Sequence, residues 1–362
     1  MKVLISGASV GGPVLAYWLR RHGAEAELVE RAPAPRSGGQ AIDIRGAALT
    51  VADRMGVLEQ ARALRTTMRG MSMLDGEGNE LMRSTEGTLS GGAFDSPDVE
   101  IMRDDLTALL MDAAAPDIRY GDSIAALAQD ADGVDVTFDS GRRDRYDYVV
   151  GADGLHSNVR RLAFGPEERF VHHLGAYVSI FTAPNFLGLD HWQTWFQDGA
   201  VGGCVYSDRD TTTMRVNLGF QDGPVAYDHR DTDAQKRLIQ ERCAGLGWEG
   251  PRLLEAMWKA DDFYFDAMAQ VKMERWSAGR VTLVGDAGYC ASPLSGQGTS
   301  LAMVGAYVLA QELAAGPAAA LDRYEHRMRP FVAANQALAT ENPGQGAAPE
   351  SIQRAATAIT LD

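Results

Sequence analysis

The strongest constraint on this chain comes from three glycine-centred segments that each follow an apolar, strand-like run. They are Gly7 to Gly12, Gly151 to Gly154, and Gly285 to Gly298. A glycine-rich turn between a buried strand and a helix lets backbone N–H groups approach a phosphate-bearing ligand, because no Cβ stands in the way. Each segment alone is weak evidence. Their order over almost the whole chain predicts one dinucleotide site assembled from distant parts of the sequence.

The first segment opens a βαβ unit over residues 2–30. It departs from the GxGxxG fingerprint, because Ser9 replaces the second glycine, although a serine hydroxyl can donate to a phosphate. Glu30 ends the next strand, 18 residues after Gly12, where a carboxylate can accept ribose hydroxyls and disfavours a 2′-phosphate. The segment therefore suits FAD or NAD. The contacts predicted here are Gly7, Ser9, Val10, Gly11, Gly12 and Glu30.

Two alternatives apply to this first segment. One is a glycine-rich turn with no ligand. The other is a short-chain dehydrogenase with the pattern GxxxGxG, but Pro13 occupies the third glycine position and no YxxxK occurs in the sequence. We therefore set the dehydrogenase aside.

The second and third segments add different chemistry. Asp153 lies in a tight turn that a strand brings close to a phosphate-bearing ligand, so we name it as a cofactor contact, although an ordinary Asp-Gly turn would look the same. Asp286 follows the strand 281–284, so its carboxylate can accept hydroxyls from a ribityl chain. Pro293 then begins a rigid turn into a helix from about residue 299, whose partly positive N-terminus would stabilise an anionic reduced flavin. The contacts predicted in this turn are Pro293, Gly296, Gln297 and Gly298.

The charge balance narrows the class of partner. The 362 residues include 49 acidic and 34 basic side chains, a net charge of −15, with a pI of about 4.9. Such a surface repels nucleic acid and anionic membranes, so we expect neither as a partner. The three cysteines are far apart and form no CxxC, which favours a reducing cytoplasm over a disulfide framework or metal site. We expect no signal peptide and no transmembrane segment.

The remaining patterns predict an α/β fold with an α+β insert. We expect a Rossmann-like FAD-binding domain from residues 1–170 and 265–318, an antiparallel-sheet substrate domain at 171–264, and C-terminal helices at 319–362. The first part of the FAD-binding domain is expected to include some substrate-domain strands. Further expected helices cover 46–66, 101–114, 231–245, 299–315 and 319–340; expected strands cover 134–138, 146–150, 177–182, 192–196, 203–206, 213–220 and 263–265; 84–98 is a loop or edge hairpin, and 342–349 a flexible break before a last short helix.

The inserted sheet is the expected floor for a substrate. Along 213–220, Arg215 and Asn217 share one face of a strand, which could meet a phenol, an enolate or a carboxylate, or could equally face solvent. Trp192, Thr194 and Phe196 form another one-sided set, with Trp195 opposite; such aromatics suit a flat ligand or a core. We name Thr194, Arg215, Asn217 and Pro293 as substrate contacts.

Together with Glu100 to Leu106, these segments resemble the group A flavoprotein monooxygenases, the aromatic hydroxylases of the p-hydroxybenzoate hydroxylase type. The resemblance covers roughly residues 1–330. Within this group, Gly38 to Arg45 is most similar to enzymes that hydroxylate tetracyclines and other aromatic polyketides. The resemblance implies that Pro293 lies near the isoalloxazine and that FAD is contacted by Arg31, Asp43, Arg45, Arg103 and Asp286.

The resemblance also implies a reaction. NADPH or NADH reduces FAD, O2 adds at flavin C4a, and the hydroperoxide hydroxylates an electron-rich aromatic or polyketide-like small molecule. The cofactor does the difficult chemistry, so we name no catalytic side chain and no metal. Two alternatives are a non-hydroxylating FAD-binding protein that sequesters a small molecule, and a flavin halogenase, whose WxWxIP motif Trp192 to Trp195 does not match. Substrate identity, Baeyer–Villiger insertion and the choice of NADPH or NADH stay open.

Overall fold

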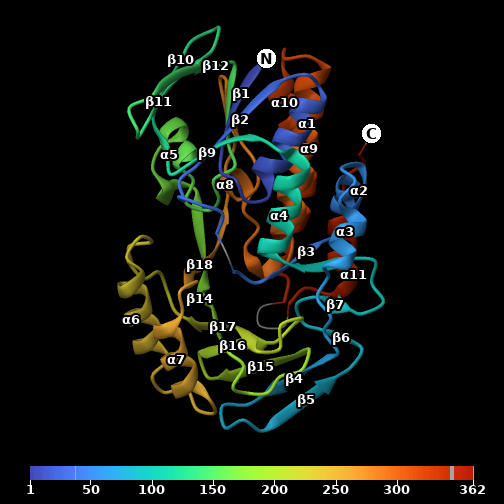
Figure 1. Ribbon diagram of the computed structural model, residues 1–362, viewed down its shortest axis with the longest axis vertical. Helices are drawn as coiled ribbons and strands as arrows, with labels where there is room; N and C mark the ends of the chain where they lie inside the picture. The colour runs from blue at the N-terminus through green and yellow to red at the C-terminus, as the bar shows by residue number, and fades with distance from the viewer. Residues whose placement is uncertain (37, 343–345, 362) are drawn as a thin grey trace.

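The computed structural model describes residues 1–36, 38–342 and 346–361, and it places them in two lobes joined by long strands (Figure 1). The upper lobe contains a six-stranded sheet in the order β19-β20-β13-β1-β2-β9, parallel except for β19 at one edge. Its strands are β1 Lys2–Ser6, β2 Glu25–Glu30, β9 Asp117–Tyr120, β13 Tyr148–Gly151, β19 Ser277–Ala278 and β20 Val281–Leu283.

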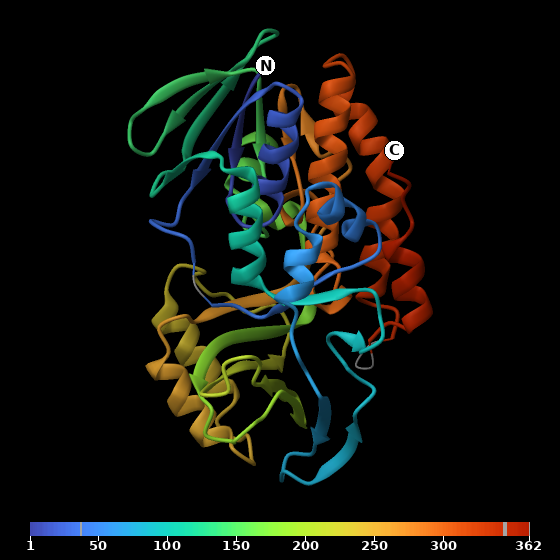
Figure 2. The same ribbon diagram turned by 45° about the vertical axis from the view of Figure 1, so that its right-hand side comes forward.

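Both faces of this sheet are buried, as expected for parallel strands. Val3 and Ile5 point into one apolar core, and Leu4 points into a second core on the opposite face. Helices cover the first face, and a three-stranded sheet with α5 covers the second (Figure 2). The covering elements are α1 Gly11–Arg21, α2 Ala47–Arg54, α3 Leu58–Ala63, α4 Arg103–Ala114, α9 Gly298–Ala315 and α10 Ala320–Leu338 on one side, and β10 Ile124–Gln129, β11 Val134–Phe138, β12 Arg143–Tyr146 and α5 Asn158–Phe164 on the other.

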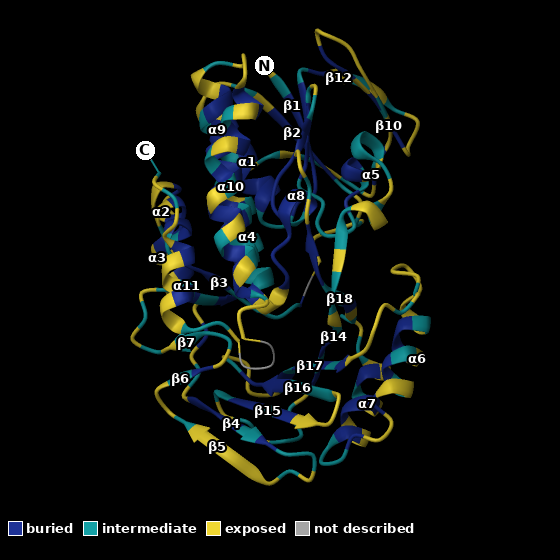
Figure 3. Ribbon diagram, turned by 180° about the vertical axis from the view of Figure 1, so that it is seen from behind, coloured by how far each residue is buried: buried dark blue, intermediate teal, exposed yellow. Residues whose placement is uncertain are grey.

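The lower lobe is built on a seven-stranded sheet in the order β18-β14-β17-β16-β15-β4-β5. Neighbouring strands are antiparallel except β15 and β4, which are parallel. A third apolar core lies between this sheet and helices α6 and α7, whose outward sides are exposed (Figure 3). The elements are β4 Gly70–Leu74, β5 Glu80–Ser84, β14 Val171–Pro184, β15 Trp192–Asp198, β16 Val201–Tyr206, β17 Thr213–Gln221, β18 Tyr264–Val271, α6 Thr232–Arg242 and α7 Gly250–Lys259.

Short elements connect the lobes. β3 Ala41–Ile44 pairs with β8 Val99–Met102, and β6 Gly87–Thr88 pairs with β7 Gly92–Ala93 as the hairpin expected within 84–98. Three short helical turns lie between α5 and β14 and between β20 and α9, and a last helix follows α10. These are η1 Glu167–Arg169, α8 Asp286–Tyr289, η2 Pro293–Ser295 and α11 Pro349–Ala356.

Most of the predicted elements are confirmed, but one predicted helix is divided, and α7 and several strands, β4 among them, were not predicted. The helix expected over 46–66 is two helices, because Gly56 takes a positive φ of 76° between them. β4 was missed because its residues are almost all buried and show no alternation. Of the break expected at 342–349, residues 343–345 lie outside the described part.

Among the described residues, no helix is both long and apolar enough to cross a membrane.

Candidate functional site

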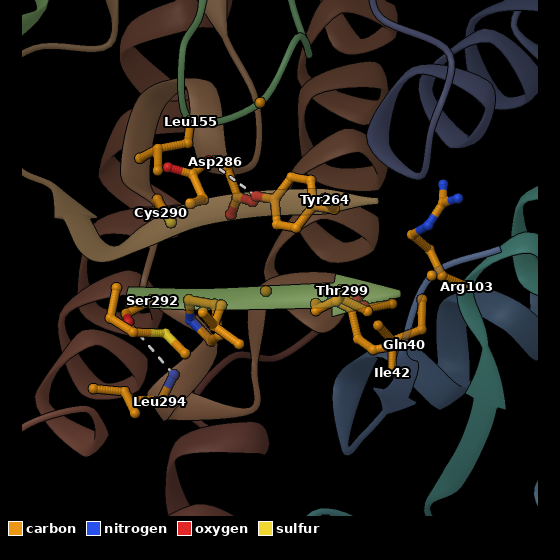
Figure 4. A pocket seen from close by; sticks show the side chains of 18 of the residues that line it. Gln40, Ile42, Arg103, Leu155, Tyr264, Asp286, Cys290, Ser292, Leu294 and Thr299 are labelled. Atoms are coloured by element: carbon orange, nitrogen blue, oxygen red, sulfur yellow. Dashed lines mark hydrogen bonds between the residues drawn. The ribbon is translucent and has the colours of Figure 1, made fainter. Parts of the chain in front are cut away.

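A large cavity of about 3240 Å³ lies between the two sheets (Figure 4). Single-ligand pockets measure about 300–1,000 Å³, so this cavity has room for a dinucleotide and a second molecule. All three glycine segments contribute to its wall, although they are far apart in sequence. Of the predicted contacts, those that line it are Gly7, Ser9, Val10, Gly11, Glu30, Arg31, Asp43, Arg45, Arg103, Asp153, Asn217, Asp286, Pro293, Gly296, Gln297 and Gly298.

The first segment forms a tight cradle between β1 and α1. Gly7 has a φ of 109°, and a Cβ there would lie 2.3 Å from the carbonyl oxygen of Ala152. A Cβ on Gly12 would lie 1.9 Å from the carbonyl oxygen of Gly7, so Gly12 is required for packing of the helix on the strand and does not itself line the cavity. In the described chain, no side chain caps α1 at Val10, which leaves its first N–H groups for an anion.

The carboxylate of Glu30 holds the loops on both sides of this cradle. Its Oε2 accepts from the backbone N–H of Ala8 at 3.0 Å, and its Oε1 accepts from that of Ala32 at 2.8 Å. A carboxylate fixed in this way keeps lone pairs that can accept ribose hydroxyls. The predicted role of Glu30 remains a prediction that this geometry favours.

Asp153, a predicted cofactor contact, forms several hydrogen bonds within the protein. Its carboxylate accepts from the hydroxyls of Ser157 and Ser6 and from the backbone N–H of Val159 at 3.1 Å. These bonds fix the loop that leads into α5, and they use much of the acceptor capacity of the carboxylate. Burial raises the pKa of Asp153. The residue lines the cavity, so its contact with a cofactor stays a prediction beside its role in fixing this loop.

The third segment supplies an amide without hydrogen-bond partners and a stretch of backbone with free space beside it. Gln297 is fully buried, and within the described residues neither atom of its side-chain amide has a hydrogen-bond partner. Nothing in the described structure lies within 4 Å of a Cβ placed on Gly296. α9 begins at Gly298 with no acidic residue in its first turn. Asp286 lies close to this helix start, since a Cβ placed on Gly298 would be 3.7 Å from Asp286 Oδ1. Burial raises the pKa of Asp286. The turn therefore offers donors and space to a flat polar ring.

The segment from Gly38 to Arg45 brings two arginines to the cavity. The guanidinium of Arg103 donates to the carbonyl oxygens of Gly38 at 2.6 Å and Arg36 at 3.1 Å, and burial lowers its pKa. Arg45 forms a buried ion pair with Asp43 at 2.9 Å. Burial raises the pKa of Asp43 to about 7 despite the attraction of Arg45. Arg103 thus presents a cation without a bonded carboxylate in the described structure, whereas Arg45 is paired with Asp43.

Two predicted substrate contacts need correction. The side chain of Thr194 pairs across the sheet with Val205, which belongs to the core under α6 and α7, so it lies on the face away from the cavity. Arg215 is on the cavity side, but its guanidinium donates to Asp262 Oδ2 at 2.9 Å and to the Thr182 hydroxyl. Within the described chain, neither side chain lines the cavity. Asn217 does line it, and its Oδ1 has no hydrogen-bond partner among the described atoms.

The sequence reasoning missed a polar cluster at the junction of the lobes. The imidazole of His156 lies between Glu167 at 2.8 Å and Asp266 at 3.1 Å, and Asp266 also accepts from Tyr227 and Tyr264, each at 2.9 Å. Burial lowers the pKa of His156, but the two carboxylates raise it more, to about 9. The only sequence signal was the alternation of Tyr264 and Asp266 along a strand.

The residues present fit the predicted FAD. Two uncapped helix N-termini suit a pyrophosphate and a flavin ring, and the unpartnered amide of Gln297 offers hydrogen bonds to polar ring atoms. The cradle at Gly7 and Gly12 leaves no room for larger side chains.

Comparison with known proteins agrees with this fit. The family described as FAD binding domain matches residues 1–339. An uncharacterized protein of Mycobacterium tuberculosis is 52% identical over 366 residues, covering 99% of this chain and 98% of its own length. A flavin-dependent monooxygenase from an unknown prokaryotic organism is 44% identical over 341 residues, covering 93% of this chain and 88% of its own.

Solved structures give the same result. The crystal structure of tetracycline destructase Tet(55) matches with a TM-score of 0.89 and 39% identity, covering 100% of this chain and 98% of that one. That of tetracycline destructase Tet(51) matches with a TM-score of 0.89 and 36% identity, covering 100% and 99%.

Proposed function

Because the chain belongs to the FAD-dependent monooxygenases, in the FAD-binding-domain family, we propose that it hydroxylates an aromatic or polyketide-like small molecule with O2 and NADPH or NADH. FAD is the cofactor of this family. The observation that carries the proposal is the cavity of about 3240 Å³ that the predicted FAD-binding segments share with the lower sheet, which forms its floor. The relatedness to two tetracycline destructases favours a polycyclic substrate.

The chemistry divides between cofactor and protein. Bound FAD supplies hydride acceptance and activation of O2. The start of α1 would hold the pyrophosphate, Asp286 would accept from the ribityl chain, and the start of α9 would lie against the flavin ring. The partly positive N-terminus of α9 would favour negative charge on the reduced ring.

The lower sheet positions the second molecule. Trp195, Asn217 and the glycines of β16 and β17 line the floor, where fused rings could lie. Enclosure between the sheets would exclude water from the reacting atoms, which such oxygen chemistry requires.

The test is oxygen uptake by the FAD-loaded protein with tetracycline and a series of hydroxylated anthraquinones and naphthols, each with NADPH and with NADH. We expect at least one compound to stimulate uptake and to yield a product that has gained one oxygen atom. Oxidation of NAD(P)H with no oxygenated product from any compound would instead favour a protein that binds its ligand without hydroxylating it.

A further inference from the structure

One row of side chains crosses the floor of the cavity. Cross-strand pairing joins Trp195 to Cys204, Cys204 to Asn217, Asn217 to Ile180, and Ile180 to Tyr264. Directly paired residues share one face of a sheet, and all five line the cavity. With strands about 4.8 Å apart, the row is about 19 Å long, which is enough for several fused rings laid across the strands.

The neighbouring row on the same face is already satisfied by the protein. It consists of Gln193, Tyr206, Arg215 and Thr182. The amide of Gln193 donates to Ser90 at 2.8 Å, the hydroxyl of Tyr206 accepts from the backbone N–H of Ala41 at 2.8 Å, and Arg215 is paired with Asp262. The one cation of this row is thus neutralised, so the row does not favour a carboxylate-bearing ligand.

Tyr264 ends the cavity row and presents its hydroxyl in a defined state. The ring is 41% exposed, and this exposure opens into the cavity, where Figure 4 shows it beside Asp286. Its hydroxyl donates to Asp266 Oδ2 at 2.9 Å. Asp266 is fixed in turn by His156, Tyr227 and the backbone N–H of Ala267. With its only proton committed, the Tyr264 oxygen offers lone pairs to a ligand and no donor.

We propose that Tyr264 determines specificity by accepting a hydrogen bond from a hydroxyl of a neutral, flat, polycyclic substrate that lies along the row from Trp195. The assignment deepens the proposed function and rests on it for the presence of a substrate in this cavity. Burial and the nearby carboxylates of Asp266 and Asp286 raise the pKa of Tyr264. Its hydroxyl therefore stays protonated, keeps its proton directed at Asp266 and offers lone pairs to a neutral hydroxyl of the ligand.

The test measures ligand binding to the oxidised, FAD-loaded protein without NAD(P)H. The probes are an anthraquinone with hydroxyls at its two opposite ends and the dimethyl ether of the same compound, and the readout is the change in flavin absorbance on titration. For the wild-type protein we expect the dihydroxy compound to bind about three- to tenfold more tightly, as for one neutral hydrogen bond. In Tyr264→Phe we expect the two compounds to bind about equally.

Tyr227→Phe is the matched control. Tyr227 also donates to Asp266 at 2.9 Å and also lines the cavity, but it lies outside the row that runs from Trp195 to Tyr264, and its ring packs against Phe265 at 5.0 Å. This variant should therefore keep the preference for the dihydroxy compound. A preference that survives in Tyr264→Phe, equal binding of both compounds to the wild-type protein, or failure of both to bind would overturn the proposal. Because the titration involves no turnover, a protein that keeps this preference but oxygenates nothing would disprove the proposed function and leave this inference standing.

Discussion

At the scale of single residues, the cofactor side of the cavity depends on groups that the protein leaves unsatisfied. Gln297 is the clearest case, because its amide is fully buried and no described atom bonds to it. A buried amide without partners costs about 1–3 kcal/mol. Arg215 shows the opposite situation, since its charge is satisfied within the protein by Asp262. The unsatisfied amide of Gln297, within the cavity wall, is therefore a better sign of a ligand contact than the paired charge of Arg215.

The residue-scale prediction is that Gln297→Met has opposite effects on stability and on FAD binding. Methionine has a similar shape and no amide to desolvate, so the FAD-free variant should be about 1 kcal/mol more stable than the wild-type protein. FAD should bind the variant more weakly, because hydrogen bonds to the flavin are lost. Urea unfolding of the FAD-free protein and titration with FAD measure the two effects. A variant that is less stable and binds FAD normally would show that Gln297 has only a packing role.

At the scale of elements, the two lobes meet where β14 and β18 pass beside the loop before α5. Both strands belong to the lower sheet, yet β18 also contacts α8 in the upper lobe. His156 ties this junction together, because its two ring nitrogens reach Glu167 of η1 and Asp266 of β18. Its side chain is 23% exposed, so its ion pairs are only partly screened by solvent.

The element-scale prediction is that His156→Gln destabilises the protein in a pH-dependent way. The pKa of His156 is raised from 6.5 to about 9, so its stabilisation is fully present below pH 6.5 and is lost as the pH rises through about 9. The shift corresponds to about 3 kcal/mol at most. The urea midpoint of the variant should be well below that of the wild-type protein at about pH 6, and close to it at about pH 10.

The control for this prediction is His172→Gln, which removes an exposed histidine of β14. It should leave the pH dependence of unfolding unchanged. A constant difference between His156→Gln and the wild-type protein over the whole pH range would show that packing, and not the charge of His156, stabilises the junction.

At the scale of the whole molecule, the cavity couples the lobes. Its wall includes Gly7 and Asp286 from the upper lobe and Asn217 and Tyr264 from the lower one. A ligand that contacts both lobes stabilises only the state in which they are assembled. The net charge of −15 repels an anionic cofactor, so the contacts that the cavity wall makes with the cofactor must offset this repulsion.

The whole-molecule prediction concerns this coupling. FAD at a hundred times its Kd should stabilise the folded protein by about 2.7 kcal/mol. Far-UV circular dichroism and flavin release should then report one coincident thermal transition that moves upward with FAD concentration. Two separate transitions, with only one sensitive to FAD, would mean that the lobes unfold independently.

The sequence by itself determined the cofactor side of this protein. Strand, glycine turn and helix start are contiguous at Gly7 and again at Asp286, so their chemistry can be read locally. Alternation along β17 also separated Asn217 from the buried residues of that strand, as the structure confirms. The specific roles of the predicted contacts remain predictions.

Only the tertiary structure decided the substrate side. Alternation says which side chains share a face, but not which face meets the cavity, so Thr194 was placed on the wrong side and Trp195 was passed over. Arg215 pairs with Asp262, which lies 47 positions away in the sequence. His156 contacts Asp266, which lies 110 positions away. No local pattern records such pairs, because chain folding alone brings their side chains together.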